Sequence, residues 1–262
     1  EVFINMESRT EYPQELVDDL VEMGVVVHFN LYNIENVAGN RHAVERLGNY
    51  TVLTSSMNYA TNKQAFAKRT MDIAGGIVGC IFTGIIFIFI APVIYISSPG
   101  PIFFSQTRVG QNGKRFKIYK FRSMYMDAEE RKKELMSQNE MEGLMFKMEN
   151  DPRVTKVGKF IRKTSIDELP QFWNILKGEM SLVGTRPPTE DEFLQYEGYH
   201  RRRLNMTPGL TGLWQVSGRS DTKNFEEIVA MDVEYIDNWS LKEDIKILFK
   251  TVGVVLKGKG AS

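Results

Sequence analysis

The stretch "IAGGIVGCIFTGIIFIFIAPVIYI", residues 73–96, decides the fold, because it runs for 24 residues without a charged side chain. About 20 apolar residues are enough to cross the hydrocarbon core of a bilayer. The alternative, a buried helix of a soluble domain, is usually shorter and less uniformly apolar. The stretch therefore predicts a helix that lies in a membrane.

Basic residues flank this stretch on both sides: Lys63, Lys68 and Arg69 before it, and Arg108, Lys114, Arg115, Lys117, Lys120 and Arg122 after it. Since basic segments favour the cytoplasmic side, the flanks predict a re-entrant helix that enters and leaves by the same face. Such a helix would bend at Gly84 or Pro92, or at one of three further glycines, Gly75, Gly76 and Gly79. A plain transmembrane helix remains an alternative, because charge bias is a tendency and a catalytic domain can follow a span.

Residues 1–58 have an α/β pattern, with a helix in "PQELVDDLVEMG" (13–24) and strands in "VVVHFNL" (25–31) and "YTVLTSS" (50–56). Polar turns are expected around 36–41. A few parallel strands need further strands to cover both faces, so this segment is interpreted as the C-terminal part of a Rossmann-like module with something missing upstream. It contains no glycine-rich phosphate loop, so a nucleotide-binding role for this segment is unsupported.

Beyond the apolar stretch, residues 99–126 alternate apolar and basic side chains around Gly110–Gly113, which predicts a β-hairpin. A basic patch beside anionic lipid is compatible with the same pattern. Residues 127–149 are charged and helical in pattern. In residues 244–258, apolar residues and lysines at helical spacing fit either a core helix or an interfacial one.

The composition excludes several classes of protein. Lys+Arg and Asp+Glu are both 33 in 262 residues, whereas a general nucleic-acid binder would be basic. The single cysteine, Cys80, rules out a disulfide framework within the chain. The histidines, His28, His42 and His200, are too far apart for a metal-binding motif and are expected at the surface or in loops.

"KTSIDELPQFWN", residues 163–174, contains two adjacent carboxylates, Asp167 and Glu168. Ser165 and Glu168 fit a capping box, which is the structural explanation. With Ser165 as the cap, however, Pro170 would fall inside the helix and break it. We therefore expect the helix to begin near Asp167, with both acids at an entry whose free N–H groups attract anions, and this is a hint of an active site.

Five segments together match one pattern: "KRTMD" (68–72), "PGPIFFSQTRVGQNGKRFKIYKFRSM" (99–124), "IRKTSIDELPQFWNILKGEMSLVGTRP" (161–187), "TPGLTGLWQVSGR" (207–219) and "MDVEYIDNWSLKEDIKIL" (231–248). In this order they resemble the large branch of the bacterial monotopic phosphoglycosyl transferases, over about residues 66–258. The resemblance implies an α+β catalytic part at 99–262, preceded by a connector and re-entrant helix at 59–98 and the partial Rossmann-like module at 1–58. Two local departures are Gly84, where many members have Ser-Pro, and Thr185 in Gly-Thr-Arg-Pro, where Gly-Pro-Arg-Pro is usual.

The implied reaction has two steps. An aspartate attacks the β-phosphate of a UDP-sugar, expels UMP, and then passes the phosphosugar to undecaprenyl phosphate. By resemblance Asp167 is the nucleophile, and Glu168 its partner in holding Mg²⁺. Phosphate-binding and supporting residues follow from the same motifs: Arg162, Arg186 and Lys120 for phosphate, Arg219 for the nucleotide pocket, and Asp232 and Asp244 as acids of the C-terminal part.

The chemistry itself requires such a set of residues. A diphosphate repels a carboxylate, so cations must neutralise its oxygens in the transition state. Adjacent carboxylates also raise each other's pKa, a tendency that Mg²⁺ and arginine reverse.

The resemblance further implies UDP-glucose as first donor and UDP-galactose as second, and a place at the cytoplasmic face of the bacterial membrane. Phe172 and Trp173 are expected either at the interface or in the core. A homodimer is plausible for an enzyme of this kind. Two other hypotheses are a non-catalytic scaffold of polysaccharide assembly, which would not need Asp167, Glu168 and Arg186 together, and a single-span anchored domain with other ligands.

Overall fold

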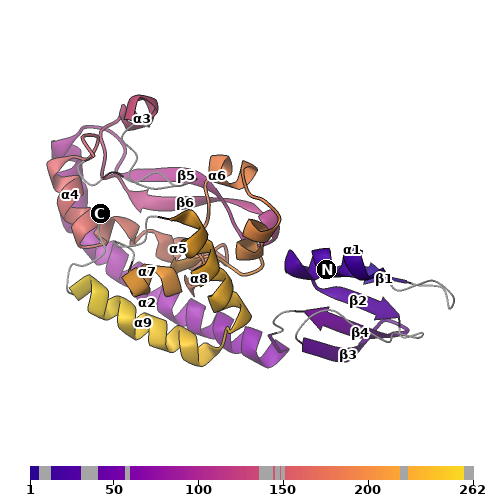
Figure 1. The fold of residues 1–262 in the computed structure, drawn as a ribbon. Helices are drawn as coiled ribbons and strands as arrows, with labels where there is room; N and C mark the ends of the chain where they lie inside the picture. Colours follow the sequence, from indigo (N-terminus) through magenta and orange to yellow (C-terminus); the bar gives the residue numbers. More distant parts are fainter. Residues whose placement is uncertain are drawn as a thin grey trace.

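The computed structural model describes residues 1–5, 13–30, 41–56, 60–135, 144, 148, 151–218 and 224–256. A small N-terminal module and a larger catalytic part are joined by one long helix, α2 (Figure 1).

The N-terminal module is a four-stranded sheet with one helix. Its elements are β1 (Val2–Ile4), α1 (Gln14–Glu22), β2 (Val27–Asn30), β3 (Arg41–Leu47) and β4 (Tyr50–Ser56), in the sheet order β1-β2-β4-β3. The valines and Phe29 of α1 and β2 form its core. The predicted helix and both predicted strands are present. Only β1 and β2 are parallel, however, because β4 returns antiparallel to β2 as the second strand of a hairpin with β3. This hairpin was not predicted from the sequence, and the Rossmann-like assignment stays a prediction.

Helix α2 (Asn62–Ser97) is continuous over 36 residues. Thr61 starts it with a capping box, accepting from the backbone N–H of Gln64 while the Gln64 side chain accepts from that of Thr61. At 1.5 Å per residue it is about 54 Å long, and it is long and apolar enough to cross a membrane. Gly84 and Pro92 both lie inside this one helix, so a bend at either residue stays a prediction.

The glycines of α2 are contact points with the catalytic part. A Cβ atom on Gly75, Gly76 or Gly79 would lie 2.5, 2.7 and 2.2 Å from the side chains of Leu182, Leu176 and Phe172. The three glycines therefore let neighbouring segments approach the α2 backbone closely, which is a packing role that the sequence analysis did not predict for them. Gly84 differs, because its Cβ would meet nothing within 4 Å.

Helix α2 contacts the catalytic part along most of its length. Near its start, Arg69 donates to the carbonyl oxygens of Ile175 and Leu176, at 2.7 Å each. Near its end, Ile90 and Ile94 pack with Phe121 and Ile161 in one buried cluster. The opposite side of α2 is a broad apolar surface with exposed side chains that include Phe66, Val78, Ile81, Ile88, Phe89 and Ile96.

The catalytic part begins with the predicted hairpin, β5 (Phe103–Val109) and β6 (Arg115–Phe121), which are antiparallel and joined by the 3₁₀ turn η1 (Gln111–Gly113). This prediction is confirmed. Helix α3 (Ala128–Leu135) forms the first part of the predicted helix at 127–149, most of whose remainder lies outside the described residues.

The remaining elements build a core around a short parallel strand pair. They are α4 (Lys156–Lys163), η3 (Ile166–Glu168), α5 (Gln171–Lys177), β7 (Ser181–Val183), α6 (Glu190–Leu194), η4 (Tyr199–Leu204), β8 (Gly209–Thr211), α7 (Leu213–Gly218), α8 (Phe225–Asp237) and α9 (Leu241–Leu256). Strands β7 and β8 pair in parallel. A Cβ on Gly209 would lie 2.0 Å from the backbone nitrogen of Gly184, so the two backbones can approach this closely only with glycine at position 209. The segment "TPGLTG" (207–212) thus contains strand β8.

One face of α9 packs in the core, as the core-helix hypothesis expects, and the interfacial hypothesis stays a prediction. Ile247 is fully buried in the main core, whereas Phe249 is 75% exposed and Val252 is exposed beside it. In Figure 1, α9 (yellow) runs beside α2 along the lower edge of the molecule.

Candidate active site

The two adjacent acids lie on a 3₁₀ turn, not on an α-helix. Asp167 and Glu168 belong to η3, and α5 begins only at Gln171 with Pro170 as its N-cap. Ser165 is in the left-handed region, with φ of 55°, and its side chain makes no cap hydrogen bond. The expected helix start near Asp167 was therefore wrong by four residues, because a proline is best tolerated where an N–H has no helical partner.

The environments of the two acids differ. Asp167 is only 7% exposed. Glu168 is partly exposed, and its carboxylate lies 2.7 Å from the ammonium of Lys120 on β6. The structure thus joins the "KFRSM" motif to the acidic pair, 48 residues away in sequence.

Arg162 reaches the same place from α4. Thr155 caps this helix by accepting from the N–H of Gly158. A Cβ on Gly158 would lie 1.9 Å from the carbonyl oxygen of Ser123, so α4 packs directly on the chain that follows β6. One turn further on, Arg162 donates from Nε to the Ser123 hydroxyl at 3.0 Å.

Arg186 lies in the loop after β7 and has an acidic neighbour on α6. Thr189 and Glu192 form a capping box that fixes the Glu192 side chain at the start of this helix. The Glu192 carboxylate lies 3.9 Å from Arg186 and 4.0 Å from Arg108 of β5. Burial and the charge of Arg186 lower the pKa of Arg108 to about 10, so the Arg108 guanidinium is still charged at neutral pH. Two cations held this close favour binding of an anion.

These residues surround one cavity of about 420 Å³, here called the basic cavity. Six cationic side chains line it: Arg108, Lys120, Arg122, Arg153, Arg162 and Arg186. Asp167 and Glu192 are among its acidic residues. The buried Nε atoms of Arg108 and Arg122 have no hydrogen-bond partner among the described residues, and buried N–H donors of this kind need an acceptor. The cavity is therefore built to bind an anion with several oxygens beside a buried carboxylate.

Four of the nine charged residues that line the basic cavity were predicted as site residues from the sequence. Lys120, Arg162, Asp167 and Arg186 meet there as expected. The missed charged residues are Arg108, Arg122, Arg153, Glu192 and Glu129. The first two stand inside the quoted motif "QTRVGQNGKRFKIYKFRSM", so the motif itself contained their signal, whereas Arg153 and Glu192 come from segments without one.

Asp232 and Asp244 lie outside the basic cavity, and both are buried carboxylates in ion pairs. Asp232 binds Arg203 at 2.7 Å, and Arg203 also donates to the carbonyl oxygen of Arg186 at 3.4 Å. In "RRRL" (201–204), Arg202 and Arg203 are buried although a run of basic residues usually lies on a solvated face. Asp232 therefore supports the backbone that presents Arg186.

Asp244 acts on the same loop from the other side. Its carboxylate binds Lys68 at 2.6 Å and accepts from the hydroxyl of Tyr235 at 2.6 Å. Burial and the charge of Asp244 raise the pKa of Tyr235, so this hydroxyl is a neutral donor. Lys68 in turn donates to the carbonyl oxygen of Val183 at 2.8 Å, three residues before Arg186. Arg219 lies outside the described residues.

The histidines form no metal site in the described part of the chain, where no group of three His, Cys, Asp or Glu side chains converges. His28 and His200 are buried, which corrects the expectation of surface positions, and His28 hydrogen-bonds Thr54 at 2.8 Å. The side chain of His42 lies outside the described residues. The adjacent carboxylates of Asp167 and Glu168 are the pair that would hold Mg²⁺, an ion bound by one or two carboxylates together with substrate phosphates and water.

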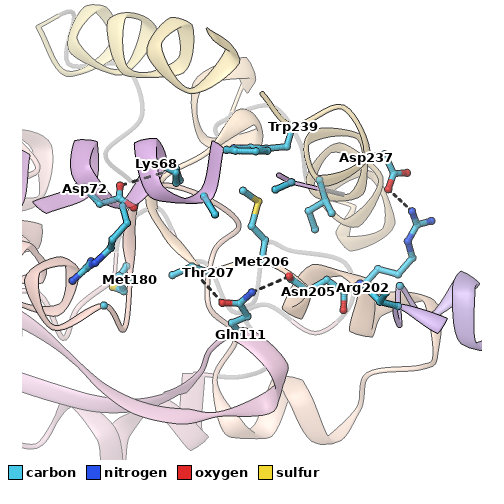
Figure 2. Close-up of a pocket in the computed structure, with 17 residues that line it drawn as sticks. Lys68, Asp72, Gln111, Met180, Arg202, Asn205, Met206, Thr207, Asp237 and Trp239 are labelled. Carbon is cyan, nitrogen blue, oxygen red and sulfur yellow. Dashed lines mark hydrogen bonds and ion pairs between the residues drawn. The ribbon is translucent and has the colours of Figure 1, made fainter. Parts of the chain in front are cut away.

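A second hollow, the junction pocket, of about 430 Å³, lies where Gly24 and Val26 of the N-terminal module meet the catalytic part (Figure 2). Its charged side chains already have partners: Lys68 binds Asp244, Arg202 binds Asp237 at 2.5 Å, and Asp72 accepts from Ser181 and Leu182. Among the two, the basic cavity is therefore the better candidate for an anionic substrate.

Comparison with known proteins agrees with this chemistry. The family model described as bacterial sugar transferase matches residues 63–258. The chain is 52% identical over 250 residues to the galactosyl transferase CpsE of Streptococcus agalactiae serotype III (strain NEM316), covering 95% of this chain and 55% of that protein. It is 45% identical to the UDP-galactose-lipid carrier transferase of Erwinia amylovora (80% and 44% covered). It is 46% identical to the undecaprenyl-phosphate galactose phosphotransferase of Salmonella typhimurium (strain LT2; 78% and 43% covered). The chain spans about half the length of these curated relatives.

Proposed function

The chain belongs to the bacterial sugar transferase family, and from this premise we propose that it transfers a hexose 1-phosphate from a UDP-sugar to undecaprenyl phosphate. The products are UMP and a lipid diphosphate sugar, the starting unit of a capsular or extracellular polysaccharide. The observation that supports the proposal most is a buried carboxylate, Asp167, in a cavity lined by six cations.

In the proposed mechanism, a carboxylate oxygen of Asp167 attacks the β-phosphorus of the donor. A bond forms between this oxygen and phosphorus, and the bond from phosphorus to the bridging oxygen breaks, so that UMP leaves with the electron pair. An oxygen of the lipid phosphate then attacks the same phosphorus and releases the Asp167 carboxylate. Splitting the transfer in two lets each substrate meet the enzyme in turn.

The cations of the basic cavity stabilise the charge that this chemistry creates. Arg108 and Arg186 are positioned to bind phosphate oxygens, in place of the long contacts that each makes with Glu192. Lys120 holds Glu168 beside the nucleophile. Asp167 and Glu168 would hold Mg²⁺ together with the donor phosphates, and the ion would supply further neutralisation of the diphosphate.

The apolar surface of α2 supports a place for this reaction at the membrane. A lipid phosphate keeps its head at the interface, so an enzyme embedded there can react with it without extracting the lipid. The packing of α2 against the catalytic part from Lys68 to Ile94 favours a helix that stays with its domain, and the cytoplasmic face, where UDP-sugars are made, is the proposed side.

The donor and the nucleophile can be tested together by measuring UMP release in membranes or detergent. We expect release from UDP-glucose or UDP-galactose, which differ only in the orientation of one hydroxyl; the sequence analysis places glucose first, whereas the names of the three relatives carry galactose. Asp167→Asn should lose at least about a thousandfold in rate, because the nucleophile is removed, while the protein stays in the membrane fraction. Unchanged UMP release from Asp167→Asn would reject the nucleophile, and no release by the native protein from any UDP-sugar would favour the non-catalytic scaffold.

A further inference from the structure

A third hollow, of about 300 Å³, lies next to the end of the acidic turn, where Leu169 and Pro170 line it. It is called here the apolar hollow, and three parts of the fold line it: Cys80 and Thr83 from α2, Phe103 and Tyr119 from the hairpin, and Leu169 and Trp173 around the start of α5. None of the residues that line it is charged, in contrast to the basic cavity.

The apolar hollow and the basic cavity share a border. Phe103 lines both, and Leu169 follows directly on Asp167 and Glu168 in the chain. On β6, Tyr119 lines the hollow and its neighbour Lys120 lines the cavity. The acidic turn therefore lies close to both the basic cavity and the apolar hollow.

The apolar hollow is fixed in place by α2. The hydroxyl of Thr83 lies 3.0 Å from the carbonyl oxygen of Leu169 and 2.6 Å from that of Gly79, its two possible acceptors. The hollow is open at its rim, since Trp173 is 56% exposed and Phe103 is 47% exposed. Covering an exposed aromatic ring with apolar groups is favourable, because it removes the apolar surface of the ring from water.

We propose that the apolar hollow seats the hydrocarbon chain of the acceptor, in the part nearest its phosphate. This inference rests on the proposed function and adds a binding site to it. A UDP-sugar has no hydrocarbon chain, and its hydroxyls, phosphates and uracil carbonyl and N–H groups would find few polar partners in a hollow lined mainly by apolar side chains. A polyprenyl phosphate has an apolar chain ending in an anion, and it matches the succession of membrane surface, apolar hollow and basic cavity.

The first test fills the hollow and separates the two half-reactions. Cys80→Phe places a ring in the hollow, and the matched control Ile81→Phe adds a ring at the next position, which is 62% exposed and does not line the hollow. We expect Cys80→Phe to raise the KM for polyprenyl phosphate roughly tenfold or more, the size of effect that a change in an apolar pocket produces. UMP release from UDP-sugar without acceptor should stay within about twofold of the native rate, and Ile81→Phe should leave both half-reactions unchanged.

The outcomes separate this inference from the proposed function. If Cys80→Phe and Ile81→Phe have the same KM for the acceptor as the native protein, the apolar hollow is not the chain site, although UMP release would still support the transferase. If the native protein releases no UMP from any donor, the proposed function itself fails.

A second measurement decides the matter where Cys80→Phe fails to fold. A polyprenyl phosphate with a photoreactive group on its first isoprene unit should crosslink the native protein to peptides that contain Cys80, Thr83 or Trp173. Unlabelled polyprenyl phosphate should compete, and phospholipid should not. Crosslinks confined to the outer face of α2, or competition by phospholipid at equal concentration, would overturn the proposal.

Discussion

At the scale of single residues, the basic cavity depends on cationic side chains that the fold holds close together although their charges repel one another. Arg108 and Arg186 are both charged and both close to Glu192, and the Nε of Arg108 is buried without a partner in the described structure. Bringing like charges together is unfavourable without an anion. The natural explanation is a substrate whose phosphate oxygens complete this arrangement.

The prediction at this scale is that Arg108→Gln weakens donor binding. A hydrogen bond to a charged group contributes about 1.5–3 kcal/mol, so the KM for the UDP-sugar should rise roughly tenfold or more in steady-state UMP release. The matched control is Arg115→Gln, seven residues away on the same hairpin, whose exposed pair with Glu190 should contribute little. Equal KM values for the two variants would remove Arg108 from the site.

The residues of the candidate site could be predicted from the sequence where they stand next to one another in the chain. Asp167 and Glu168 are adjacent, and Pro170 marks their position as unusual. Arg153 and Glu192 could not be predicted, because they reach the cavity only through an ion pair with Asp151 and a capping box, and neither depends on a motif around the acids.

At the scale of elements, three glycines of α2 fix how the membrane helix meets the catalytic part. Phe172 of α5 packs on Gly79, and α5 follows the acidic turn directly. The way α2 packs on the catalytic part therefore affects the candidate active site, because α2 contacts α5 and, through Thr83, the residue that ends the acidic turn.

We predict that Gly79→Leu lowers stability and that Gly84→Leu does not. A side chain at position 79 would overlap the ring of Phe172, and such overpacking costs about 1–3 kcal/mol. Position 84 is open, so the same substitution there is a matched control. Thermal unfolding in detergent should show a lower midpoint for Gly79→Leu only. Equal midpoints for the two variants would contradict the close packing of α2 on α5.

The hairpin of β5 and β6 was predictable because its pattern and its turn are continuous in sequence. The start of α5 and the pairing of β7 with β8 could not be predicted. Pro170 displaces the start of α5, and the paired residues of the two parallel strands are 28 positions apart in the sequence. The bend of α2 was expected from composition alone, and composition does not separate a glycine that bends a helix from one that is a packing contact.

At the scale of the whole molecule, the question is how α2 lies in the bilayer. One side of the helix is covered by the catalytic part from its first turns to its last, and the other side is apolar and exposed. A helix that crossed the membrane would have to bring much of the catalytic part into the hydrocarbon core or separate from it.

The topology prediction follows from this packing. Cysteines placed at Asn62 and at Asn112, each in a Cys80→Ala background, should react with a membrane-impermeant thiol reagent from the same side of sealed vesicles. The Cys80→Ala protein itself is the control, since it has no other cysteine. Labelling of the two positions from opposite sides would reject a re-entrant helix and favour a plain span.

The most direct test of the proposed chemistry is the mass of the peptide that carries Asp167. The native protein is incubated with its UDP-hexose without acceptor, quenched and digested, and Asp167→Asn is treated in parallel. The expected result is a hexose phosphate added to this peptide in the native protein alone, and its loss when polyprenyl phosphate is supplied. An unmodified peptide, in protein that releases UMP and turns over under the same conditions, would contradict a covalent intermediate on Asp167.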